Sequence, residues 1–408
     1  MTAARALHHV AAPARAGART TPDTPAARKV DRRTFLITAA AASMGAPSLA
    51  QAAPASGNAS AAEIAIGQSA VLSGPLSPPA LVLQSGVRLA FEEANGQGGI
   101  GGRKLRLISL DDAFDAERAL ANYRTLVGKE NVLACIAGVG AIATTAGLPL
   151  LREAGVPLVG ATAVVDSVRA KSEGVAYYTR ATQMREAEVL VQHLATLGQN
   201  RIAVAHLGTP GGLEVLSQIR TVGEKYQVQI AGSTAIAPDG SNLAAAAREV
   251  AALQAHAVIL FLTAAHAPAL IKAVTAAGSV PSYYGMSILA GDVTAKLLGD
   301  QYRGLAISAV TPYPWDGANA DAQQFRRAAE QAKVPVGYHS YEGYIAARAL
   351  IQAIRQTGGE LSRARLHTSL SRLRMRFATM DIDFNGDRGT GTRFVELVRA
   401  RADGRYVR

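Results

Sequence analysis

A glycine-rich turn near residue 140 is the stretch best suited to chemistry. Gly138-Val139-Gly140-Ala141-Ile142-Ala143 follows an apolar strand and opens a helix, so it superficially matches the GxGxxA motif of dinucleotide-binding folds. That motif needs an acidic residue at a strand end about 20 positions later, and the region offers only Val156 to Ala163. The free amides and positive dipole end of a helix N-terminus bind a smaller anion instead. The sequence therefore predicts a carboxylate held by backbone amides of Gly140, Ala141 and Ile142.

Two features stay open at the sequence level, one in this turn and one after an earlier strand. Thr144 either adds a hydroxyl to the anion site one turn into the helix or bonds only to the backbone. Asp111-Asp112, at an earlier strand end, would suit a metal, but Ser109 to Phe114 holds no third ligand nearby. A metal-binding role and a structural role of the pair both stay open at this point.

Other catalytic patterns are missing from the sequence. The histidines show no HxH or HExxH spacing, and there is neither a GxSxG elbow nor a GxxxxGK[ST] phosphate loop. The sequence predicts no catalytic residue, no metal and no cofactor, and the scattered histidines are interpreted as surface or core residues: His193, His206, His256, His266, His339 and His367.

The elements that position these residues begin with the segment from Ile64 to Asp112. An apolar strand is stopped by Ser73-Gly74-Pro75, a helix follows over Leu81 to Asn95, and a glycine turn leads into the strand Leu105 to Leu110. This order is one right-handed βαβ unit. Ligands of such sheets sit beyond the carboxyl ends of the strands, which indicates Ser73 as a further candidate.

The strand followed by SGP, the helix, and then NGQGGIGGRKLRLISLDD resemble the type I periplasmic binding fold, in the branch of receptors for leucine, isoleucine and valine. The likeness runs from about Ile64 to a last strand at Phe394 to Val398. It implies an α/β fold of two doubly wound parallel-sheet lobes joined by a three-crossing hinge. Function then consists of ligand binding by lobe closure and not of catalysis.

Alternating apolar strands and helices place the lobes along the chain. A first set runs to the connecting strand Ala176 to Arg180, and a second ends at Ser282 to Met286. Leu305 to Val310 is expected to return to lobe one, and a long helix at Tyr341 to Gln356 to lie there. The predicted division is a leader at 1–52, lobe one at 63–180, lobe two at 181–304, the return crossing and second part of lobe one at 305–375, and the last part of lobe two at 376–404.

The return crossing passes through TPYPWD, where two prolines and two aromatic residues predict a stiff, packed hinge segment around Thr311, Tyr313 and Trp315. Glu342 starts the long helix nearby, and it either caps that helix or reaches the cleft.

The resemblance implies that Asp111-Asp112 lies at the sheet edge and is largely structural. It also implies which residues contact the ligand. The serine that the leucine-binding branch uses for the carboxylate falls on Ala141 here, which is a departure. A second contact in lobe one falls on Thr162, Ala163 and Val164, with a plain turn as the alternative. The corresponding positions in lobe two include Thr209, Thr263 and Ser287.

The lobe-two positions contain neither an aromatic residue nor the carboxylate that pairs with the ammonium of an amino acid in the family. A buried ammonium without a partner costs several kcal/mol. The sequence therefore favours an organic or aromatic acid as the ligand, although the resemblance keeps a branched-chain amino acid as the alternative.

The first 52 residues have the composition of a leader. Asp31-Arg32-Arg33-Thr34-Phe35-Leu36 precedes a short apolar run and small residues at Ser48, Ala50 and Ala52, which predicts a twin-arginine export signal. Seven of the 42 Lys/Arg and two of the 31 Asp/Glu lie there, so the remaining chain carries +6 and not +11. The alternative is a basic tail that happens to contain Arg-Arg.

The remaining composition narrows the class of protein. At 408 residues and 49% hydrophobic content the chain can form two cores. Its longest basic run, Arg372 to Arg376, lacks interleaved aromatics, so we interpret it as a solvated helix end and expect no nucleic-acid partner. The lone Cys135 rules out an intramolecular disulfide and, being far from the leader, an acylated N-terminal cysteine.

The resulting hypothesis is a periplasmic, monomeric receptor that closes over a small carboxylate and delivers it to the permease and ATPase of an ABC importer. It would be no lipoprotein, and its mature chain would have no transmembrane helix. An exported enzyme and a sensor subunit that presents its ligand to a membrane kinase are the alternatives.

Overall fold

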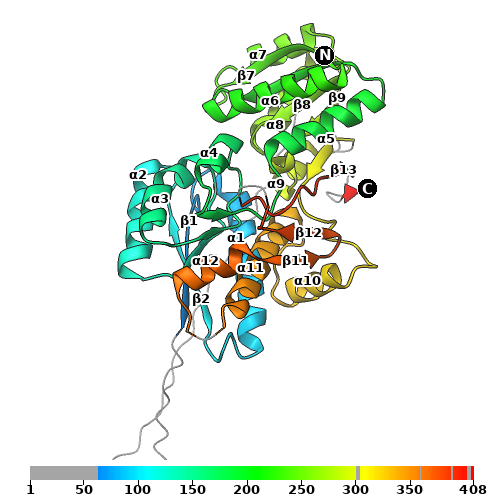
Figure 1. Ribbon diagram of the computed structural model, residues 1–408. Coiled ribbons are helices and arrows are strands. Elements are labelled where there is room, and N and C mark those ends of the chain that lie inside the picture. Colours follow the sequence, from blue (N-terminus) through cyan, green and yellow to red (C-terminus); the bar gives the residue numbers. More distant parts are fainter. Residues whose placement is uncertain (1–62, 300–303, 359, 387–388, 402–405) are drawn as a thin grey trace, which may run out of the picture. The chain divides into compact units, whose positions relative to one another are not determined.

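The computed structural model describes residues 63–299, 304–358, 360–386, 389–401 and 406–408. The predicted export signal lies outside these residues. The described chain forms two α/β lobes, each built on a mainly parallel sheet with helices on both faces (Figure 1). This confirms the fold class predicted from the sequence.

Lobe 1 is built on a five-stranded parallel sheet in the order β2-β1-β3-β4-β5. Most of β1 is buried, because one set of its side chains, such as Ile64 and Ile66, enters one core while Ala65 packs against the other. A strand covered on both faces requires such a continuous apolar run. The strands are β1 Ile64–Ala70, β2 Leu105–Asp111, β3 Ala134–Ile136, β4 Leu158–Val159 and β5 Ala176–Tyr177.

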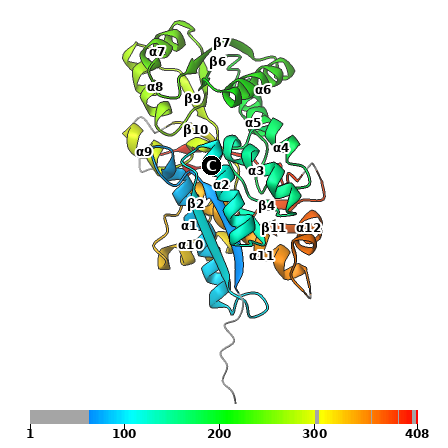
Figure 2. The same ribbon diagram turned by 90° about the vertical axis from the view of Figure 1, so that its left-hand side faces the viewer.

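Helices cover both faces of this sheet. On one face α1 and α11 lie side by side (Figure 1), so close that a Cβ on Gly86 would lie 1.8 Å from the carbonyl oxygen of Ser340. On the other face α2 and α3 pack their apolar residues against β3 and β4 (Figure 2). The helical segments are α1 Ser77–Gly96, α2 Ala116–Arg124, η1 Thr125–Lys129, α3 Ala141–Glu153, α4 Asp166–Lys171, α10 Ala320–Gln331, α11 Tyr338–Gln356 and α12 Arg363–Ser371.

Lobe 2 is built on a seven-stranded sheet in the order β14-β13-β10-β9-β8-β6-β7, in which β13 and β14 run antiparallel to their neighbours. Its two cores lie on opposite faces. The elements are α5 Gln183–Thr196, β6 Arg201–Leu207, α6 Pro210–Tyr226, β7 Gln229–Ile236, α7 Leu243–Ala252, β8 Ala257–Phe261, α8 His266–Ala276, β9 Ser282–Gly285, η2 Ser287–Leu289, α9 Asp292–Leu298, β10 Ala306–Ala309, β13 Glu396–Ala400 and β14 Tyr406–Val407.

The chain passes between the lobes three times, and two of the predicted boundaries were wrong. The strand at Leu305 to Val310 does not return to lobe 1, because β10 pairs with β9 and β13 in the sheet of lobe 2. The return crossing follows it and ends at α10, an unpredicted helix whose Phe325 lies in the core of lobe 1.

The segment predicted at 376–404 as part of lobe 2 is split between the lobes. β11 Arg374–Phe377 and β12 Met380–Asp383 form a hairpin whose apolar side chains join the core of lobe 1, and only β13 and β14 belong to lobe 2. Arg374 and Arg376 were expected at a solvated helix end. They are exposed, but they lie on β11 opposite Asp383 and Asp381.

Two further features bear on the expected class. Among the described residues, no helix combines the length and apolar character that a membrane crossing requires. Cys135 is a free, fully buried thiol in β3, and burial raises its pKa to about 12. It is therefore an inert part of the core.

Candidate ligand-binding site

The turn between β3 and α3 forms an uncapped helix N-terminus at the carboxyl end of the lobe 1 sheet. Gly140 is the N-cap residue, with φ of +92°, and no side chain of the described residues caps the helix. The Gly140 N–H donates to the carbonyl of Thr162 at 2.9 Å, and the Thr162 N–H donates to the carbonyl of Gly138 at 2.9 Å. The predicted carboxylate turn is thus joined by its backbone to the loop after β4.

Among the residues predicted in this turn, Ile142 is 44% exposed, whereas Thr144 is fully buried. The Thr144 hydroxyl donates to the carbonyl of Gly140 at 2.9 Å. The structure therefore favours the alternative in which Thr144 bonds only to the backbone. A ligand contact by the amides of Gly140, Ala141 and Ile142 stays a prediction.

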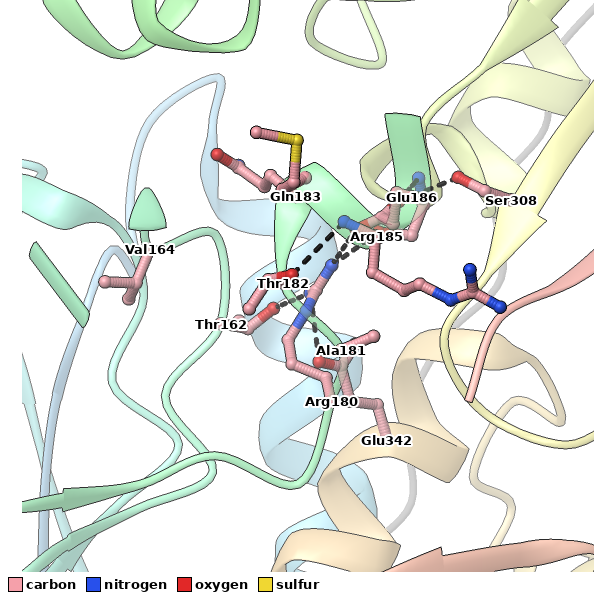
Figure 3. A network of polar contacts seen from close by, with 12 residues as sticks. Thr162, Val164, Arg180, Ala181, Thr182, Gln183, Arg185, Glu186, Ser308 and Glu342 are labelled. Carbon is pink, nitrogen blue, oxygen red and sulfur yellow. Dashed lines mark hydrogen bonds and ion pairs between the residues drawn. The ribbon is translucent and has the colours of Figure 1, made fainter. Parts of the chain in front are cut away.

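The loop after β4 contains Thr162, and a buried arginine contacts it (Figure 3). Arg180 lies in the first crossing, directly before α5, and its Nη1 donates to the hydroxyl oxygen of Thr162. The same Nη1 lies 3.1 Å from Oε1 of Glu342 in α11. Glu342 therefore does not cap α11, whose N-cap residue is Gly337; it pairs with the crossing instead.

The other end of the Arg180 guanidinium binds lobe 2. Nη2 lies 2.9 Å from Oε1 of Glu186 in α5 and also donates to the hydroxyl oxygen of Ser287. Ser287 in turn donates its N–H and its hydroxyl to Glu186, at 2.8 and 3.0 Å. Ser308 in β10 donates to Glu186 at 2.7 Å. One guanidinium therefore connects Thr162 of lobe 1 with Ser287 of lobe 2, two residues that the sequence placed at the ligand.

The buried charges of this network stabilise one another. Burial disfavours the charged form of Arg180, but the attraction of Glu342 and Glu186 outweighs it and raises the pKa of Arg180 above its ordinary value. Because every group in the network is less than a tenth exposed except Thr162, loss of one partner would leave an unpaired buried charge.

A second buried arginine supports the same crossing. Arg169 of α4 donates to the main-chain carbonyls of Val164, Arg180 and Ala181, and its guanidinium lies 4.4 Å from the ring centroid of Tyr178. Burial, with a smaller contribution from Arg180, lowers the pKa of Arg169 to about 10. Val164 and Ala163, which were predicted to face the ligand, belong to this supported loop; Ala163 adopts a left-handed conformation with φ of +54°.

The acidic pair Asp111-Asp112 at the end of β2 forms hydrogen bonds with the loop after β1 and with the loop that follows β2, at the same edge of the sheet. Asp111 accepts from the Ser73 hydroxyl at 2.6 Å and from the amides of Leu72 and Ala113, and these bonds, led by that from Ser73, lower its pKa to about 2. Asp112 accepts from Ser69, and burial raises its pKa. Both carboxylates thus bond to groups of their own loops, which favours the structural interpretation. A ligand contact by Ser73 stays a prediction.

In lobe 2 the predicted threonines begin helices. Thr209 caps α6 by accepting from the Gly212 amide at 3.2 Å. Thr263 shares a hydrogen bond of 2.9 Å with Nδ1 of His266 at the start of α8. Both hydroxyls thus have local partners, and their contact with a ligand stays a prediction.

The two lobes also meet directly through α4 and α6. Glu214 of α6 accepts from the amide of Ser167 at 2.8 Å and from its hydroxyl at 2.6 Å. Asp166 accepts from Gln218 of α6 at 3.1 Å and from the first two amides of α5. We call these contacts of Asp166 and Ser167 with lobe 2 the α4 clasp.

The return crossing is packed by aromatic rings, as its composition predicted. Trp315 lies 5.4 Å from Tyr313 and 5.8 Å from Tyr338, measured between ring centroids. Tyr313 donates its hydroxyl to the carbonyl of Tyr406 at 2.7 Å. Thr311 is almost fully buried. A hinge role of these residues stays a prediction.

The sequence did not reveal Arg180 and Glu186 as part of the site. Arg180 stood at the end of a connecting strand and Glu186 at a helix start, both unremarkable positions for charged residues. The one available signal was a lone basic residue, Arg180, which follows the pair Tyr177-Tyr178 after one threonine, where the chain leaves the first sheet. A charge next to such a run needs a buried partner.

Two α/β lobes with three crossings, and with polar loops and a helix N-terminus at the carboxyl ends of the lobe 1 strands, define a ligand-binding protein of the two-lobe periplasmic type. A family model described as periplasmic binding protein matches residues 63–405. The chain belongs to this family, as a type I periplasmic binding protein of the leucine/isoleucine/valine-binding kind. The family consists of substrate-binding receptors.

Individual relatives agree with this assignment. The crystal structure of an extracellular ligand-binding receptor from Verminephrobacter eiseniae is 27% identical, covers 85% of this chain and 100% of its own, and has a TM-score of 0.79. A solute-binding protein of an ABC transporter from R. palustris, solved with benzoate, is 19% identical with a TM-score of 0.75, covering 85% of this chain and 95% of its own; it shows likeness of fold alone. Leu/Ile/Val-binding protein homolog 7 of Brucella suis is 34% identical over 120 residues, which span 29% of each chain.

Proposed function

We propose that this protein is the solute-binding receptor of an ABC importer, which closes its lobes over a small carboxylate and delivers it to a membrane permease and ATPase. The observation that carries the proposal is the connection from the uncapped α3 N-terminus through Thr162 to Arg180 and Ser287. Amides at a helix N-terminus favour an anion. The guanidinium makes the position of that anion site dependent on both lobes.

Thr162 is the side chain best placed to donate to the ligand. Its oxygen accepts from Arg180, and its backbone is paired with Gly138 and Gly140. A hydroxyl that accepts from a guanidinium keeps its own proton for another acceptor. We propose that a ligand carboxylate takes this proton together with the amides at the start of α3.

The charge pattern favours a ligand without an ammonium group. The buried network contains two carboxylates, those of Glu186 and Glu342, and both are paired with Arg180. An ammonium would have to compete with this guanidinium for them. We therefore propose an organic or aromatic acid in preference to a branched-chain amino acid.

A thermal-shift screen of purified protein tests the ligand class. We expect benzoate or another monocarboxylate to raise the melting temperature, because a ligand that binds only the folded state stabilises it by mass action. The matched amide, benzamide, should have no effect. Thr162→Val should weaken carboxylate binding about fivefold, the worth of one hydrogen bond, whereas Thr196→Val on the exposed end of α5 should not.

Two results would contradict the proposal. Equal stabilisation by benzoate and benzamide would remove the carboxylate from recognition. Strong stabilisation by leucine, isoleucine or valine would retain the receptor function but reverse the choice against an amino acid.

We also propose that the chain is exported to the periplasm by the twin-arginine route and acts there as a monomer. The support is the sequence Asp31-Arg32-Arg33-Thr34-Phe35-Leu36 before an apolar run. Replacing both arginines, Arg32→Lys with Arg33→Lys, should retain the protein in the cytoplasmic fraction. Unchanged periplasmic yield would contradict this route.

A further inference from the structure

Phe114 is the one phenylalanine among the described residues that is more than 36% exposed. Its side chain is 39% exposed and belongs to none of the four buried apolar clusters of the two lobes. Large aromatic side chains normally lose most of their exposure on folding. Phe114 therefore lies outside the described cores of both lobes.

The position of the ring next to the anion site is specific. A Cβ atom added to Gly140 would lie 2.8 Å from Cε2 of Phe114, so the ring rests on the backbone of the residue that caps α3. Ile142, in the first turn of α3, is the other strongly exposed apolar side chain of this turn. An aromatic ring and an aliphatic side chain thus border the uncapped amides.

The chain holds Phe114 there by an unusual backbone conformation. Ala113 and Phe114 are consecutive left-handed residues, with φ of +47° and +63°, although neither is glycine. The carboxylate of Asp111 accepts from the amide of Ala113 and that of Asp112 from the amide of Phe114, each at 2.9 Å. A left-handed pair persists only where other bonds stabilise it. The acidic pair at the end of β2 thereby fixes the direction of the ring.

We infer that Phe114 is a specificity-determining residue that contacts the carbon skeleton of the ligand, and that this skeleton is an aromatic ring carrying a single carboxylate. The inference rests on the proposed function, because it needs the carboxylate at the start of α3. A ring attached to that carboxylate would contact the Phe114 ring, and aromatic pairs favour such offset or edge contacts. A second carboxylate at the same place would lose its water against an apolar surface.

Calorimetric titration with benzoate, butyrate and succinate tests this inference on wild type, Phe114→Leu and Phe114→Tyr. We expect wild type to bind benzoate more tightly than butyrate and to show no preference for succinate. Phe114→Leu should weaken benzoate binding at least tenfold and change butyrate binding by less than threefold. Phe114→Tyr keeps the ring and should retain benzoate binding within threefold. Leu197→Ala, an exposed apolar residue at the end of α5, serves as the control and should bind like wild type.

The outcomes distinguish a failure of the Phe114 inference from a failure of the proposed receptor function. If wild type binds benzoate and Phe114→Leu binds it equally well, the ring contact is wrong and the receptor function stands. A wild type that prefers succinate also overturns the inference alone. Failure of the wild type to bind any of the three acids overturns both. Circular dichroism melts that match wild type show that a loss in Phe114→Leu is not a loss of folding.

Discussion

Nη1 of Arg180 in the first crossing lies 3.1 Å from Oε1 of Glu342 in α11, and both side chains are less than a tenth exposed. The two residues are 162 positions apart in the sequence. With Glu186 of α5 on the other side of the guanidinium, the pair places a charged junction between the two lobes (Figure 3). Buried ion pairs add little net stability compared with apolar residues, but their geometry is specific. The two ion pairs of Arg180 therefore fix the position of the first crossing relative to α5 and α11.

Arg180→Met should destabilise the fold by about 3 to 5 kcal/mol, because it leaves Glu186 and Glu342 buried without their cation. Urea unfolding followed by circular dichroism measures the change. Arg374→Ala, which removes an exposed pair with Asp383, should change the stability by less than about 0.5 kcal/mol. Equal stability of Arg180→Met and wild type would show that the buried charges are not coupled as the distances indicate.

The α4 clasp should contribute to the closed state. Opening of the lobes would break the two bonds from Ser167 to Glu214, so Glu214→Ala should favour the open state and weaken benzoate binding by about 0.5 to 1.5 kcal/mol. Calorimetry gives the affinity, and energy transfer between dyes on the two lobes gives the distance. The control is Glu224→Ala, an exposed residue on the same helix. Identical affinity and transfer efficiency in the two variants would mean that the clasp has no part in closure.

The sequence predicted most of the fold because each lobe consists of local units. Apolar strands such as β1 and helices such as α1 are specified within their own segments, and their alternation indicates a parallel sheet. The sequence-based prediction assigned the β11–β12 hairpin to the wrong lobe, because its short strands are compatible with either lobe. Only packing of Phe377 and Met380 into the core around α11 decides between the lobes. Such long-range packing is not encoded in a local pattern.

The candidate site was predictable only where its residues follow from local units of the fold. The α3 N-terminus and the loop with Thr162 follow strands, so their position was a consequence of the fold. The links of Arg180 to Glu186, Glu342 and Ser287 join three distant segments, and each residue alone has the appearance of a surface charge or a polar turn. Phe114 was missed because its direction depends on a left-handed backbone that apolar spacing does not reveal.

Glu396 of β13 gives a prediction about pH. Burial raises its pKa from the ordinary 4.5 to about 7, against the opposing attraction of Arg408 and with a further contribution from Asp316. One of its carboxylate oxygens has no hydrogen-bond partner among the described residues, and the other lies 3.7 Å from Arg408. Between pH 4.5 and 7 the folded state keeps a proton that the unfolded chain releases, so the stability contributed by this group falls as pH rises.

Glu396→Gln should therefore be more stable than wild type at pH 8, by about 1 to 3 kcal/mol, and the difference should shrink towards pH 4.5. The amide keeps the shape of the side chain but carries no charge to desolvate, and it gives up only the 3.7 Å ion pair with Arg408. Urea unfolding at pH 4.5, 6, 7 and 8 measures the difference at each step. Glu173→Gln, at an exposed position after α4, should show no such trend. A difference between Glu396→Gln and wild type that stays constant with pH would mean that Glu396 ionises alike in the folded and unfolded states, and that its burial next to Asp316 is offset by Arg408.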